Sequence, residues 1–109
     1  MERIVQHKKK DYKLFVLEME DSVIAFIALH WYHAFHHTKP VGRVVAFCVD
    51  ERFRGQGYGS QLLENAEGFF RQKDCFKIEL TSNLRRKDSH EYYFRKGYRQ
   101  ASMHLIKEL

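Results

Sequence analysis

The chain has 109 residues, of which 44% are hydrophobic, 15% aromatic and 30% charged. This balance is typical of one globular domain over residues 1–109 and excludes a disordered chain, and no apolar run approaches the roughly 20 residues of a membrane helix. The 19 Lys and Arg against 14 Asp and Glu give a net charge of +5, which favours anionic partners. Basic residues are scattered apart from 8–10 and 85–87, so a nucleic-acid-binding domain is an alternative that charge alone suggests, and we expect neither nucleic acid nor a membrane as partner.

Two features bear on the cellular compartment. The charged residues 1–10 are not followed by an apolar stretch that ends in small residues, so a secretion signal is not expected. Cys48 and Cys75 are far apart in the chain and form no CxxC pattern. Such a pair is typical of reduced, buried thiols, and we therefore expect a cytoplasmic protein.

The first half of the chain favours three β-strands. Residues 12–20 mix β-branched and aromatic side chains, residues 23–31 are almost continuously apolar, and residues 44–49 form a third apolar run. A proline and a glycine among polar neighbours predict a loop over residues 33–42. We expect the three strands to form an antiparallel meander.

From residue 59 the hydrophobic period changes. Residues 59–73 carry apolar side chains at helical spacing, which predicts an amphipathic helix. The apolar face of this helix consists of Leu62, Leu63, Ala66, Phe69 and Phe70. A strand follows, because apolar residues alternate with Lys77 and Glu79.

The last third of the chain predicts one more helix and one more strand. Residues 88–96 favour a short helix that Asp88 caps and that Gly97 terminates. Residues 101–105 alternate between apolar and polar side chains, which indicates a strand. The predicted order is β-β-β-α-β-α-β, an α/β (α+β) fold with helices packed on one mixed sheet.

A glycine-rich segment, Arg54-Gly55-Gln56-Gly57-Tyr58-Gly59-Ser60, lies between a predicted strand and a predicted helix. Glycines let the backbone approach a ligand, and the free N–H groups at a helix start attract anions. Arg54 adds a positive charge, so we predict a phosphate or pyrophosphate ligand. The segment is neither a Walker A motif nor the dinucleotide-binding fingerprint. A tight turn without a ligand is the alternative.

Two motifs resemble those of the GNAT superfamily of acetyl-CoA-dependent N-acetyltransferases. Residues 54–59 match its R/Q-x-x-G-x-G/A motif, and residues 45–50 look like the strand that precedes it. Residues 86–98, RKDSHEYYFRKGY, resemble its R-x-x-A-H-x-F-Y-x-x-x-G-F/Y segment. The resemblance covers nearly the whole chain and implies an acyl-CoA N-acyltransferase-like mixed sheet.

The resemblance also implies a cofactor and residues that bind it. Acetyl-CoA would place its pantetheine arm along the strand that contains Phe47 and Val49. Its pyrophosphate would bind the loop residues Arg54, Gly55, Gln56, Gly57, Tyr58, Gly59 and Ser60. Tyr93 matches the family tyrosine that protonates the departing thiolate, a role that suits a phenol.

The chain departs from the family pattern at its start. Family domains begin with a strand and one or two helices before the meander, and those helices form part of the acceptor site. Here only residues 1–11 precede the meander, so we expect an N-terminally abbreviated domain. A non-catalytic CoA-binding or interaction module is therefore the alternative to an enzyme.

The base that deprotonates the acceptor amine is not assigned by the sequence. Glu18, Glu20, His30 and Glu79 are candidates on or beside predicted strands, but for each a solvated or structural role is favoured, and none is assigned to catalysis. The histidines at 30, 33, 36 and 37 suggest a metal site, but their segment is predicted to be a loop rather than the helix that such spacing needs. We therefore expect no metal.

The sequence as a whole predicts an N-acetyltransferase. It would move acetyl from acetyl-CoA to a primary amine of a small molecule or protein by direct attack. A strand meander with exposed edges and an aromatic loop also favours pairing of two copies, so we expect a homodimer.

Overall fold

The computed structural model describes residues 2–33, 38–80, 87–100 and 107–109. Its elements are strands β1 (Glu2–Lys9), β2 (Tyr12–Met19), β3 (Ser22–His33), β4 (Pro40–Val49) and β5 (Lys77–Leu80), the 3-10 helix η1 (Glu51–Phe53), and helices α1 (Tyr58–Gln72) and α2 (Lys87–Arg95). The strands form one sheet in the order β1-β2-β3-β4-β5. Neighbours are antiparallel except β4 and β5, which are parallel. The predicted mixed sheet with helices is confirmed.

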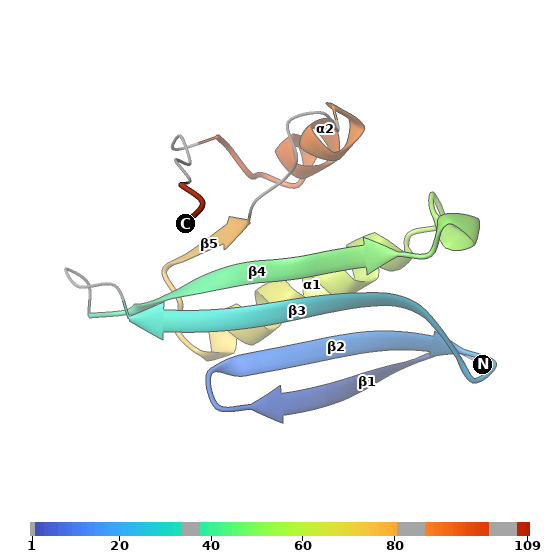
Figure 1. The fold of residues 1–109 in the computed structure, drawn as a ribbon, viewed down its shortest axis with the longest axis horizontal. Helices are drawn as coiled ribbons and strands as arrows, with labels where there is room; N and C mark the ends of the chain where they lie inside the picture. The colour runs from blue at the N-terminus through green and yellow to red at the C-terminus, as the bar shows by residue number, and fades with distance from the viewer. Residues whose placement is uncertain (1, 34–37, 81–86, 101–106) are drawn as a thin grey trace.

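Helix α1 covers one face of the sheet (Figure 1). The five apolar residues predicted for its inner face, Leu62, Leu63, Ala66, Phe69 and Phe70, are its buried residues. They pack against buried side chains of β2, β3 and β4, including Leu17, Ile27, Leu29 and Val44. Helix α2 lies beyond the β5 edge (Figure 1), and within the described residues no helix crosses the opposite face, hereafter the uncovered face.

Strand β1 was not expected from the sequence. It pairs along its whole length with β2, from Glu2–Met19 to Lys9–Tyr12, through a turn of two residues in which Asp11 has φ 61°. Only two adjacent residues of this strand, Ile4 and Val5, are apolar, so its sequence shows no alternating pattern. The sequence predicted no strand before the meander, and β1 corrects that expectation. The turn joins β1 to β2 directly, with no helix between them.

The loop predicted over residues 33–42 is shorter than expected, because β4 already begins at Pro40. Proline is tolerated at the first position of a strand, and here its carbonyl accepts a hydrogen bond from the Phe76 N–H at 3.1 Å. Gly42 lies within the sheet, where a Cβ atom would come within 2.5 Å of the Phe70 ring. Glycine is therefore needed at this position because α1 packs closely against β4, and not because the chain turns here.

An irregularity in β4 controls which side chains face α1. Ala28 pairs with Ala46 and Leu29 with Val44, so Val45 has no partner on β3. Such a bulge shifts the alternation of side chains by one residue. Phe47 and Val49 therefore contact α1, while Cys48 is exposed. The prediction that both cysteines are buried is wrong for Cys48.

Other expectations lie outside the described residues. These are the last strand predicted over residues 101–105 and the capping side chain of Asp88. Within the described part of the chain, no helix is long and apolar enough to cross a membrane.

Candidate functional site

A short loop joins the end of β4 to the start of α1. The Asp50 carboxylate accepts hydrogen bonds from the Arg52 backbone N–H at 2.9 Å and from its guanidinium Nε and Nη2 at 3.2 and 3.1 Å. Because these bonds favour the charged form, they keep the pKa of Asp50 below its usual range. Arg54 Nε donates to the carbonyl oxygen of Val49 at 3.1 Å, which holds the loop against the end of β4.

Two glycines give the loop its shape. Gly55 has φ 76° and Gly57, the N-cap of α1, has φ 89°, both in the left-handed region that favours glycine. A Cβ atom on either residue would meet no heavy atom within 4 Å, so both border open space. Helix α1 begins without a side-chain cap and without an acidic residue in its first turn. The uncapped N–H groups and the helix dipole therefore fit a phosphate.

The first turn of α1 lies on the end of β4. A Cβ atom on Gly59 would lie 3.3 Å from Val49 Cγ2 and 3.5 Å from the Phe47 ring, so glycine permits this close packing. The fold thus brings together, at one end of the sheet, the residues predicted to bind the cofactor. They are Phe47, Val49, Arg54, Gly55, Gln56, Gly57, Tyr58, Gly59 and Ser60.

Strand β4 extends further than its pairing with β5. The pairing runs from Val41–Lys77 to Val44–Leu80, whereas β4 continues to Val49. Within the described residues, positions 45–49 therefore have a neighbouring strand on the β3 side alone. Their other edge suits an extended ligand that adds to the sheet as a strand would, which the sequence predicts for pantetheine.

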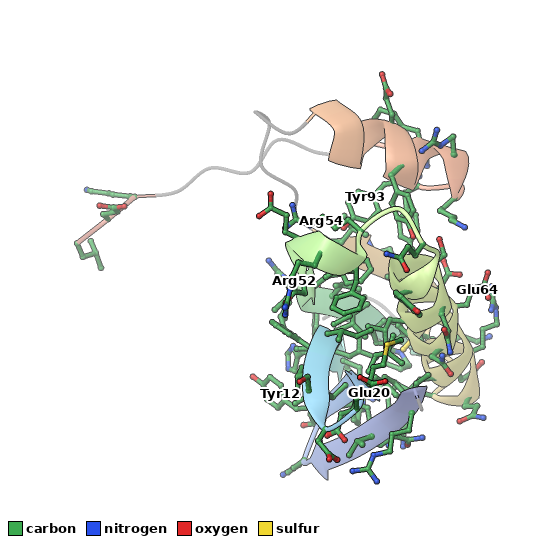
Figure 2. All side chains as sticks on the ribbon, turned by 90° about the vertical axis from the view of Figure 1, so that its right-hand side faces the viewer. Tyr12, Glu20, Arg52, Arg54, Glu64 and Tyr93 are labelled. Carbon is green, nitrogen blue, oxygen red and sulfur yellow. The ribbon has the colours of Figure 1, made fainter. Side chains whose placement is uncertain are left out.

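The hydroxyl of Tyr92 contacts the start of α1. Tyr92 Oη and Ser60 Oγ share a hydrogen bond at 2.9 Å. Tyr93 packs edge-on between the rings of Tyr92 and Tyr98, with centroids 5.5 and 5.9 Å away. In Figure 2, Tyr93 and Arg54 both lie on the α2 side of the sheet, away from Tyr12 and Glu20. The sequence alone did not indicate the Tyr92–Ser60 contact, because 32 positions separate the two residues.

Comparison with known families agrees with this geometry. The model of the Acetyltransferase (GNAT) family matches residues 2–98 of the chain. The chain belongs to the GNAT family. The uncapped start of α1 and the free edge of β4 are formed by the residues that the sequence motifs predict to bind CoA.

This GNAT chain has a curated relative and several structural neighbours. It is 38% identical over 87 residues to an aminoalkylphosphonate N-acetyltransferase of Salmonella typhimurium, a match that covers 80% of this chain and 56% of the relative. It therefore spans little more than half of that protein.

Two solved structures show the same fold. Glucosamine-6-phosphate N-acetyltransferase from Arabidopsis thaliana has a TM-score of 0.80 and 23% identity, with 90% of this chain and 67% of that one covered. A transcriptional regulator from Bacillus halodurans has a TM-score of 0.86 and 21% identity, with 94% and 69% covered.

The GNAT fold places the four candidate bases in different surroundings. Glu18 is ion-paired with Arg3 of β1 at 2.8 Å, and Glu20 lies in the turn between β2 and β3. His30 stacks between Tyr12 and Tyr32. Glu18 and Glu20 therefore lie away from the end of the β4–β5 pairing, whereas His30 is in register with Arg43 of β4, which in turn pairs with Glu79.

Glu79 is the candidate that lies at this end. It stands one residue before the last pair, Val44–Leu80, and its Oε1 accepts a hydrogen bond from Tyr32 Oη at 2.6 Å. The sequence did not indicate Tyr32 as its partner, because the two residues are 47 positions apart and are separated by β4 in the sheet.

The described residues contain no group of three or more His, Cys, Asp or Glu side chains placed to hold a metal ion. His30 and His33 lie on β3, whereas His36 and His37 lie outside the described residues. Cys48 and Cys75 are both free thiols, and Cys75 is half-buried. Burial is the main cause that raises the pKa of Cys75.

Proposed function

We propose that this chain is an acetyl-CoA-dependent N-acetyltransferase that acts on a primary amine. One observation carries the proposal: the uncapped start of α1, with open glycines at 55 and 57, lies directly against the part of β4 that β5 leaves unpaired. This arrangement offers a phosphate site and a strand edge in succession, which are the two features that a nucleotide with an extended arm requires.

Each group of residues has a part in this proposal. The loop from Arg54 to Ser60 holds the pyrophosphate, and the backbone of Phe47 and Val49 holds the arm. Bound acetyl-CoA supplies an acetyl thioester, whose C–S bond breaks as the bond from nitrogen to the carbonyl carbon forms. Tyr93 delivers a proton to the sulfur, which takes the electron pair of the broken bond.

The acceptor is proposed from the curated relative. That protein is named for aminoalkylphosphonates, which carry an amine and an anionic group in one small molecule. We propose small amines of this kind as the first acceptors to test, since this chain shares 38% of the aligned residues.

The experiment has two stages. Calorimetry with CoA and acetyl-CoA measures binding, and an assay of CoA release against aminoalkylphosphonates, amino sugars and lysine peptides measures transfer. We expect binding and turnover, with Tyr93→Phe lowering kcat by about 10²-fold or more and leaving the affinity for CoA unchanged. Tyr98→Phe is the matched control, because it removes a nearby tyrosine hydroxyl that binds Glu67 and has no part in the proposal.

The outcomes separate the candidate functions. CoA binding without turnover of any amine supports a non-catalytic CoA-binding module. The face of the sheet that no described helix covers favours this alternative (Figure 1). No binding of CoA contradicts both the enzyme and the module. A rate for Tyr93→Phe equal to that of the unaltered protein removes Tyr93 from the acid role.

We also propose a cytoplasmic homodimer. The strands carry exposed apolar side chains, with Tyr12, Val23 and Val45 exposed by 50, 57 and 48%. Burial of such side chains against a second copy stabilises a dimer. Sedimentation that finds monomers alone at micromolar concentration contradicts this part of the proposal.

A further inference from the structure

A tyrosine and a carboxylate meet on the uncovered face of the sheet, beside the point where β4 and β5 part. Tyr32 Oη donates a hydrogen bond to Glu79 Oε1 at 2.6 Å. The pair spans three strands, because Tyr32 lies on β3 and Glu79 on β5, with β4 between them. This contact holds the Glu79 carboxylate in place from across the sheet.

The strand register explains why the two side chains meet on this face. Trp31 packs against Phe69 of α1 at a centroid distance of 5.2 Å, so its neighbour Tyr32 points to the opposite face. Arg43 pairs with Glu79, and the next pair along the strands, Val44–Leu80, is the last one. Glu79 is thus one residue from the end of the pairing.

The hydrogen bond leaves part of the carboxylate available. Within the described residues, Glu79 Oε2 accepts no hydrogen bond, and Arg43 forms no ion pair with Glu79 despite being its register partner. The bond to Glu79 is the largest cause that raises the pKa of Tyr32, ahead of burial and of the charge of Glu79. Tyr32 therefore remains a protonated donor at neutral pH.

Aromatic rings form a row that leads up to this carboxylate. Tyr12 stacks on His30 at 4.6 Å, and His30 stacks on Tyr32 at 5.7 Å. Faces of tyrosine rings attract cations, and a carboxylate at the end of the row adds a full negative charge. The row and the carboxylate together suit an organic ammonium group.

We infer that Glu79, oriented by Tyr32, binds the ammonium group of the acceptor amine and takes its proton. This inference rests on the proposed acetyltransferase function. An N–H bond of the ammonium breaks, the proton moves to Glu79 Oε2, and the electron pair remains on nitrogen as the nucleophile. Glu79 then releases the proton to water. Tyr32 is a positioning residue that acts through Glu79.

The test compares Glu79→Gln with Tyr32→Phe. Glutamine keeps the size of the side chain and an oxygen for Tyr32, but it has no charge and cannot take the proton. We expect Glu79→Gln to lower kcat by about 10²–10⁴-fold and to raise the KM for the amine, with the KM for acetyl-CoA unchanged. Glu64→Gln is the matched control, because Glu64 is exposed on α1, away from the sheet (Figure 2).

The role of Tyr32 has its own readout. Tyr32→Phe alone is expected to lower kcat less than Glu79→Gln does, and the double variant is expected to be no slower than Glu79→Gln alone. Such non-additivity follows when one residue acts through the other. If the fold-losses in kcat of the two single variants multiply in the double variant, Tyr32 acts independently of Glu79, as in a purely structural contact. That result overturns the positioning role.

A binding measurement tests the inference without catalysis. Calorimetry follows the titration of an aminoalkylphosphonate into the protein saturated with CoA, for the unaltered chain and for Glu79→Gln. We expect the variant to bind the amine about tenfold more weakly or worse, as for a lost hydrogen bond to a charged group. Equal affinity, or no binding of the amine by the unaltered chain, overturns the inference. A protein that fails to bind CoA overturns the proposed function instead.

Discussion

The hydroxyl groups of Ser60 and Tyr92 lie 2.9 Å apart, and their hydrogen bond joins the first turn of α1 to α2. Ser60 belongs to the segment proposed to hold pyrophosphate, and Tyr92 is the neighbour of the proposed acid Tyr93. One side-chain contact therefore connects the proposed phosphate site with the helix that carries the proposed acid. Its strength can be measured directly.

Removal of either hydroxyl should destabilise the fold. Ser60→Ala and Tyr92→Phe are each expected to lower the free energy of unfolding by about 0.5–1.5 kcal/mol, the usual contribution of one hydrogen bond. Because both remove the same bond, the double variant should lose less than the sum of the two effects. Urea denaturation of the four proteins completes the cycle, and strictly additive losses contradict the contact.

Gly57→Ala should weaken the binding of CoA and destabilise the loop. Gly57 has φ 89°, and a side chain in this region costs about 1–2 kcal/mol. Gly68→Ala is the matched control, because Gly68 lies within α1 and its Cβ, like that of Gly57, would meet no atom within 4 Å. In a helix interior the same change stabilises by about 0.5–1 kcal/mol. Calorimetry with CoA and thermal unfolding that give the same result for both variants contradict the role of the φ angle.

Gly42→Ala should destabilise the core. The new Cβ would lie 2.5, 2.7 and 2.8 Å from three atoms of the Phe70 ring, and Phe70 is 1% exposed, so the ring has little room to move. Overpacking of this kind costs about 1–3 kcal/mol. Denaturant titration measures the loss, and an unchanged midpoint would show that α1 can shift away from β4.

Stability should fall at alkaline pH through Tyr98. Its hydroxyl donates to Glu67 Oε2 at 2.9 Å, and burial, followed by this hydrogen bond, raises the pKa of Tyr98 above its ordinary value. Because the folded state holds the proton more tightly, this stabilisation is complete below the unfolded pKa of about 10 and is lost as pH rises through the folded pKa. Tyr98→Phe should flatten the decline in the free energy of unfolding between pH 9 and 11. This range spans roughly one pH unit on either side of the pKa of tyrosine in the unfolded chain. An unchanged slope would assign the decline to other groups.

Local patterns in the sequence predicted much of the fold. Helix α1 was expected over residues 59–73 and spans Tyr58–Gln72, because five apolar residues at helical spacing can be buried together on one face only. The glycine segment was expected to form a strand-to-helix loop, and φ 76° at Gly55 and 89° at Gly57 show why glycine is needed there. Both predictions depend on interactions between near neighbours in the chain.

Other features followed no local pattern. Strand β1 was missed because the outermost described strand carries polar side chains and is held by backbone hydrogen bonds to β2. Gly42 was taken for a loop residue because its reason, the ring of Phe70, lies in another element. Cys48 was expected to be buried, and the bulge at Val45 exposes it.

The sequence by itself determined the GNAT motifs, the glycine-rich loop at residues 54–60 and the sheet with its covering helix, because each depends on residue types at short spacing. Only the tertiary structure decided which polar groups meet. It paired Tyr92 with Ser60, and it placed Tyr32 against Glu79, one of the four candidate bases. These contacts join residues 32 and 47 positions apart, and such distances are set by strand register and helix packing rather than by any pattern along the chain.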